Sequence, residues 1–86
     1  MTTLTEFKAI SLAKLARIHE ELKSRHPDNS RIDFLVELLE NKITSLGKYN
    51  LAYYLATVMD ASREFEQFRE LMPDEETTKT LLRDIE

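Results

Sequence analysis

The chain has 86 residues, of which 42% are hydrophobic and 33% charged, with a formal net charge of −4 and no cysteine. A chain this short buries only about 60 to 65% of its unfolded surface, which allows one small core shared by every helix. The absence of cysteine excludes disulfides, thiolate metal sites and cysteine nucleophiles. One glycine and two prolines provide few positions at which a helix would be interrupted. The composition therefore predicts a single helical domain over residues 1–86.

The charge is spread unevenly along the chain. Residues 1–50 carry eight basic side chains against seven acidic ones, whereas residues 51–86 carry four against nine. An acidic surface repels phosphate backbones and favours basic partners, so we do not expect nucleic acid to bind the whole domain. No apolar run approaches the roughly 18 residues of a membrane span, and the N-terminus lacks the pattern of a signal peptide. We expect a cytoplasmic protein without a membrane partner.

A first helix is predicted over residues 4–25. Thr3 and Glu6 have the spacing of a capping box, and His26 precedes Pro27, which disfavours helical angles at His26. A step of about 100° per residue places one apolar stripe toward the core. This stripe contains Leu4, Phe7, Leu15, Ile18 and Leu22, with Leu12 and His19 at its edge.

A second helix is predicted over residues 31–45. Ser30 and Asp33 resemble a helix start with an acid in the first turn, and Gly47 suits the left-handed residue that often follows a helix. The inward stripe contains Ile32, Leu35, Val36, Leu39, Ile43 and Leu46.

The remaining residues predict one long helix over 50–71 and a short one over 74–85, which begins with acids after Pro73. The long helix would be continuous, with Arg69 falling inside its apolar stripe. Short connections favour antiparallel neighbours, hence an all-α, small up-and-down helical bundle with three long helices and a shorter C-terminal helix. The stripe of the long helix contains Leu51, Tyr54, Leu55, Val58, Ala61, Ser62 and Phe65, with Phe68 and Met72 at its edge.

No residue pattern indicates catalysis or metal binding. The run from His19 to Lys23 has lysine where a zinc-peptidase helix needs its second histidine. A chain with one glycine offers neither a glycine-rich phosphate loop nor the free backbone amides of an oxyanion hole. We therefore expect no enzymatic activity, no catalytic residue, no cofactor and no metal.

Several large apolar residues remain outside the inward stripes. Phe34 and Leu38 are four residues apart, as are Tyr49 and Tyr53, so each pair forms one ridge on a helix surface. Antiparallel packing of the second and third helices would bring both ridges onto one face. Three explanations are open: the C-terminal helix covers a pair, the face forms a homodimer, or a different protein binds it. The predicted partner-binding residues are Phe34, Leu38, Tyr49, Tyr53, Asp60 and Glu64, while Ile10 and Leu71 are the other apolar residues left outside.

These features favour a small protein–protein interaction module, such as an adaptor, inhibitor or regulatory subunit of bacterial, phage or mobile-element type. It would act through the apolar patch and an acidic face, as a homodimer. The alternative is a nucleic-acid-associated transcription or nucleoid regulator, which would use a basic strip on and after the first helix. That strip contains Lys8, Lys14, Arg17, Lys23, Arg25 and Arg31.

The run from Asn50 to Tyr54, followed by Asp60, resembles part of the Hha and YmoA class of small bacterial nucleoid-associated modulators. The likeness requires a shift of one residue and does not extend to the first thirty residues. It therefore assigns no role to any residue here.

Overall fold

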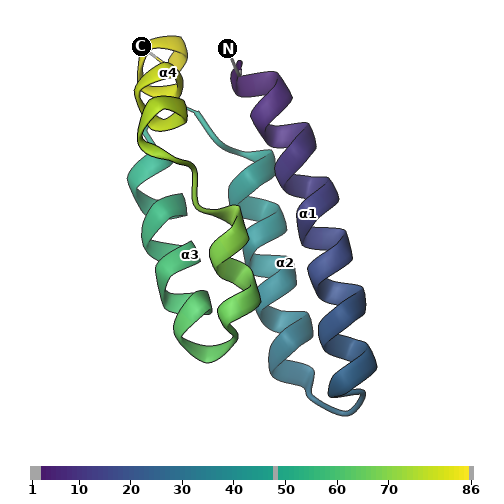
Figure 1. The fold of residues 1–86 in the computed structure, drawn as a ribbon. Coiled ribbons are helices and arrows are strands. Elements are labelled where there is room, and N and C mark those ends of the chain that lie inside the picture. Colours follow the sequence, from purple (N-terminus) through teal and green to yellow (C-terminus); the bar gives the residue numbers. More distant parts are fainter. Residues whose placement is uncertain (1–2, 48, 86) are drawn as a thin grey trace.

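The computed structural model describes residues 3–47 and 49–85. Within these ranges the chain forms helices and no strand, which confirms the predicted all-α class. Three helices run side by side, a short 3-10 helix lies against them, and the last helix lies at one end (Figure 1). In chain order the elements are α1 (Leu4–Arg25), α2 (Ser30–Thr44), α3 (Leu51–Glu64), the 3-10 helix η1 (Glu66–Leu71) and α4 (Glu75–Ile85).

Helix α1 has the predicted bounds, and both of its ends follow from local chemistry. The Thr3 hydroxyl accepts a hydrogen bond from the Glu6 amide at 3.2 Å, which satisfies one of the free amides of the first turn. At the other end His26 leaves the helical region, with φ −135° and ψ 67°, ahead of Pro27. The predicted stripe is inward: Phe7, Leu15, Ile18 and Leu22 are buried, and Leu4 and Leu12 pack against the core.

Helix α2 begins one residue earlier than predicted, because Asn29 provides the cap. Its side chain accepts from the Arg31 amide at 3.0 Å. The prediction of a left-handed Gly47 is wrong, since no described residue has a positive φ. Instead the Gly47 amide donates to Asn50 Oδ1 at 2.6 Å, and the Asn50 amide group donates to the Ser45 carbonyl. Asn50 thus closes the turn that glycine was expected to close. All six residues of the predicted α2 stripe are buried: Ile32, Leu35, Val36, Leu39, Ile43 and Leu46.

The predicted continuous helix over residues 50–71 is wrong. Helix α3 ends at Glu64, Phe65 is extended with φ −138° and ψ 109°, and η1 runs back along α3 and α1 (Figure 1). A straight helix to residue 71 would extend about 10 Å past Glu64. Glu64 lies opposite Arg31, near the start of α2, so that extension would leave the bundle. The reversal instead buries apolar surface that would face solvent.

Predictions for three residues fail for the same reason, namely that the chain reverses at Phe65. Phe68 and Leu71 lie three residues apart on one side of the 3-10 turn and are fully buried, although they were expected at the edge and outside the core. Arg69, which helical periodicity placed inside the stripe, is exposed in η1.

Tyr54 and α4 complete the core. The buried Tyr54 hydroxyl donates to the Leu71 carbonyl at 2.6 Å, and the Tyr54 ring meets Phe7 edge-on with centroids 6.0 Å apart. Burial raises the pKa of the Tyr54 phenol to about 12, partly opposed by a hydrogen bond with Ser11. In α4, Asp74 caps the helix by accepting from the Thr77 amide at 2.7 Å, and Leu81 is buried. No described helix combines the length and apolar composition that crossing a membrane requires.

Candidate interaction surface

The outer surface shared by α2 and α3 carries the six predicted partner-binding residues. We call it the α2–α3 face. Two contacts fix how its two helices are aligned. Arg31 binds Glu64 through two hydrogen bonds of 2.9 and 3.1 Å, and Lys42 Nζ lies 5.7 Å from the centroid of the Tyr53 ring. The residues of the face are Arg31, Phe34, Leu38, Asn41 and Lys42 from α2, with Tyr49, Tyr53, Thr57, Asp60 and Glu64 from α3 and the turn before it.

Three aromatic rings on this face are open to solvent. The exposed fraction is 53% for Phe34, 65% for Tyr53 and 83% for Tyr49. Leu38, one helical turn after Phe34, is half-buried. Helix α4 does not cover them, because it packs on α1 at one end of the bundle (Figure 1). The first of the three explanations, cover by the C-terminal helix, is therefore wrong. Whether the face binds a partner remains a prediction.

Cations lie over the rings of Phe34 and Tyr53. Arg31 Cζ is 5.0 Å from the centroid of the Phe34 ring, and Lys42 Nζ is 5.7 Å from the centroid of the Tyr53 ring. Each such contact is worth about 0.5–1 kcal/mol at an exposed site. The Arg31 guanidinium also has a raised pKa, because it donates hydrogen bonds to Glu64 and is attracted by its charge. Arg31 therefore contacts both the Glu64 carboxylate and the Phe34 ring.

The edge of the face is polar, and its α2 side contains a shallow groove. Asp60 pairs with Arg63 at 3.4 Å, and both side chains are well exposed. On α2, a groove of about 230 Å³ is lined by Phe34, Glu37, Leu38 and Asn41. An apolar centre with charged groups around it has the general composition of a protein interface.

The basic strip on and after α1 is engaged within the chain. Arg17 pairs with Glu70 at 2.7 Å, and Lys14 donates to the Glu70 carbonyl at 3.4 Å, so this part of α1 is bound to η1. The other members have partners too: Lys8 donates to the Thr44 carbonyl, Lys23 pairs with Asp33, Arg25 with Glu21 and Arg31 with Glu64. The strip is therefore not a row of free cations.

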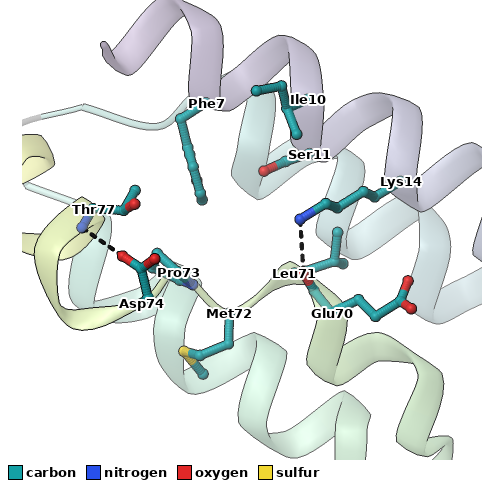
Figure 2. Close-up of a pocket in the computed structure, with 10 residues that line it drawn as sticks. All are labelled: Phe7, Ile10, Ser11, Lys14, Glu70, Leu71, Met72, Pro73, Asp74 and Thr77. Carbon is teal, nitrogen blue, oxygen red and sulfur yellow. Dashed lines mark hydrogen bonds between the residues drawn. The ribbon is translucent and has the colours of Figure 1, made fainter. Parts of the chain in front are cut away.

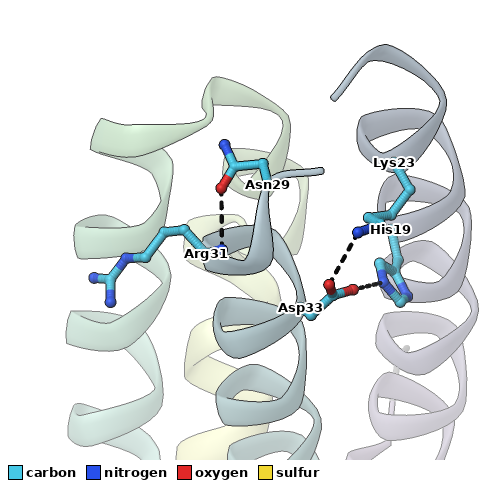
Figure 3. A network of polar contacts seen from close by, with 5 residues as sticks. All are labelled: His19, Lys23, Asn29, Arg31 and Asp33. Atoms are coloured by element: carbon cyan, nitrogen blue, oxygen red, sulfur yellow. Dashed lines mark hydrogen bonds and ion pairs between the residues drawn. The ribbon is translucent and has the colours of Figure 1, made fainter. Parts of the chain in front are cut away.

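A polar cluster joins α1 to α2, on the opposite side of α2 from the Arg31 side chain (Figure 3). His19 Nε2 lies 2.9 Å from one carboxylate oxygen of Asp33, and Lys23 Nζ lies 3.0 Å from the other. These hydrogen bonds, first that with His19 and then that with Lys23, hold the pKa of Asp33 below its ordinary value. The cluster links two helices and leaves no coordination site: no group of three His, Asp or Glu among the described residues could hold a metal ion.

A cleft of about 260 Å³ lies between α1 and the segment that joins η1 to α4 (Figure 2). The sequence did not predict it, because it exists only through the chain reversal at Phe65. Its polar groups are already bonded: Lys14 donates to the Glu70 carbonyl, and Asp74 accepts from the Thr77 amide. Phe7, Ile10, Ser11, Leu71, Met72 and Pro73 form the rest of its wall.

Comparisons of the chain with protein-family models, with curated proteins and with solved structures find no match. The function must therefore be argued from the geometry of the chain itself.

Proposed function

We propose that this chain is a small non-enzymatic protein–protein interaction module, an adaptor, inhibitor or regulatory subunit, that binds its partner through the α2–α3 face. The observation that carries the proposal is the exposure of Phe34, Tyr49 and Tyr53 on one side of the bundle. Aromatic side chains with an adjacent arginine are the residues that dominate binding energy in protein interfaces.

The physical basis is the apolar surface that a partner would remove from water. Single exposed apolar residues are common and carry no meaning, but a group that spans two helices supplies the centre of an interface. The two cations over the rings, Arg31 and Lys42, add charged groups that a partner can meet with acidic side chains. Asp60 and Glu64 at the edge favour a partner with basic residues at the corresponding positions.

Affinity capture from the native host with immobilised wild-type chain tests this proposal. A double variant, Phe34→Ser with Tyr53→Ser, removes the centre of the face. The matched control is Ile10→Ser with Leu82→Ser, which alters two side chains of similar exposure on α1 and α4. We expect the captured protein to be lost with the first variant and retained with the control. Equal capture by both variants would contradict the proposal.

A further inference from the structure

The charges on the α2–α3 face identify one occupant that it fits, namely the same face of another molecule. The α2 side carries two cations, Arg31 and Lys42, with one acid, Glu37, whereas the α3 side carries the acids Asp60 and Glu64, with Arg63 beside Asp60. A surface with a basic half beside an acidic half is complementary to itself when the second surface is turned so that the halves cross. We infer that a second copy of this chain binds here, about a two-fold axis that runs between α2 and α3 and parallel to both.

This axis follows from the alignment of the two helices within one copy. Rotation about it places α2 of one copy opposite α3 of the other without shifting either along its length. Arg31 and Glu64 lie at the same level, where they pair within each copy, so Arg31 of each copy then also faces Glu64 of the other. Every adjacent pair of helices in the resulting four-helix contact is antiparallel.

The same rotation fills the groove on α2. Lys42 lies at the level of Tyr53, and Asn41 precedes Lys42, so Tyr53 of the second copy arrives over the Leu38 and Asn41 end of the groove. The groove, of about 230 Å³, has room for an aromatic ring. The exposed Tyr53 ring of one copy would thus pack against the groove of the other copy.

A two-fold axis perpendicular to the helices is disfavoured. It would place α2 against α2 and α3 against α3, so that the basic half faces itself and the acidic half faces itself. Like charges at an interface cost free energy because both must lose water without gaining a partner.

The size of the face sets the expected strength. A helix of 15 residues is about 22 Å long, and two helices side by side are about 20 Å wide. A face of these dimensions is at the low end of the areas that specific interfaces bury. We therefore expect a dimer whose dissociation constant lies in the micromolar range.

This inference rests on the proposed function, and sedimentation over a roughly hundredfold range of concentration tests it. We expect the wild-type chain and the Ile10→Ser with Leu82→Ser control to dimerise, and the Phe34→Ser with Tyr53→Ser variant to remain monomeric. A wild-type chain that is monomeric throughout would overturn the second copy as occupant. It would leave the proposed function intact if host capture still depended on Phe34 and Tyr53. A dimer unaffected by the Phe34 and Tyr53 changes would overturn the inference and remove the support for the face.

A charge reversal tests the orientation of the axis. Arg31→Glu and Glu64→Arg should each weaken dimerisation by about tenfold or more, because each places like charges across the interface. Mixed together, the two variants should form a heterodimer in which every crossed pair is again opposite in charge, visible as the mixed mass in native mass spectrometry. Failure of the mixture to pair better than either variant alone would overturn the parallel axis. Circular dichroism of each variant shows that the helices are retained.

Discussion

At the level of single residues, Tyr54 has the largest structural role among the three tyrosines. Its ring packs on Phe7 from α1, and its hydroxyl is bound to the carbonyl at the end of η1. Helical periodicity predicted Tyr54 inward and Tyr49 and Tyr53 outward, and the exposures agree. Periodicity could not predict the hydrogen-bond acceptor, because Leu71 reaches Tyr54 only through the reversal at Phe65.

Replacing Tyr54 with Phe keeps the ring and removes the hydroxyl. The Leu71 carbonyl then loses its buried donor, so we expect the free energy of unfolding to fall by about 1–3 kcal/mol. Urea denaturation followed by circular dichroism measures the change. Tyr53→Phe is the matched control and should change stability by less than about 0.5 kcal/mol, because the Tyr53 side chain is exposed. Equal effects of the two changes would contradict the role of the Tyr54 hydroxyl.

The lowered pKa of Asp33 predicts that the stability of the fold depends on pH in the acidic range. Its folded-state pKa lies below the ordinary value of 3.8, so its carboxylate stabilises the fold above that pH, and the contribution is lost as the pH falls through the lowered pKa. The Asp33→Asn variant should be less stable than wild type at about pH 5, and the difference should shrink below about pH 4. Urea midpoints across this range measure it. Asp28→Asn, in the exposed turn between α1 and α2, is the control. A difference that persists unchanged in acid would contradict the role of the carboxylate.

At the level of elements, the sequence predicted the helices whose ends carry local signals. Caps at Thr3 and Asn29 and the proline after His26 act over a few residues, and the bounds of α1 and α2 fall within one residue of the prediction. The end of α3 has no such signal. No glycine or proline marks Phe65, and the chain turns there because Phe68 and Leu71 gain burial against α1 and α3. This gain in burial depends on how the other helices pack, so the periodicity of one helix cannot predict it.

A pair of leucines tests the position of η1. Leu71→Ala should lower the free energy of unfolding by about 2–5 kcal/mol, because the side chain is 1% exposed and its loss leaves a cavity. Leu82→Ala, in the exposed part of α4, should cost far less. Thermal or urea unfolding of both variants gives the comparison. If Leu82→Ala lowered the free energy of unfolding more than Leu71→Ala, the result would contradict the position of η1 and favour the continuous helix that periodicity predicted.

At the level of the whole molecule, the sequence predicted which apolar residues are exposed better than it predicted which charged side chains are paired. Phe34, Tyr49 and Tyr53 are exposed as expected, but Leu71 is buried. The spacing of charges in sequence could not show that the basic strip is paired, because its partners Glu70 and Glu64 lie on other elements. The cation over Tyr53 likewise follows from three-dimensional placement, because Lys42 lies on α2, whereas Arg31 and Phe34 are three residues apart on the same helix.

The pairing of the strip predicts the result of a titration with duplex DNA. A chain with a net charge of −4, whose α1 cations already bind carboxylates and carbonyls, releases few counterions from DNA. We expect no binding at low salt by fluorescence anisotropy. The Glu70→Gln variant, which frees Arg17 from its partner, shows whether the ion pair suppresses binding. Tight wild-type binding that weakens steeply with salt would instead favour the nucleic-acid regulator.

The reversal at Phe65 also bears on the order in which the chain folds. Helices α1, α2 and α3 pair with neighbours close in sequence, whereas the Arg17 to Glu70 contact spans 53 residues. Closing so long a loop carries an entropic cost that short hairpins avoid. We therefore expect η1 and α4 to dock last and to open first. In native-state hydrogen exchange, their backbone amides should lose protection together while those of α1 and α2 remain protected.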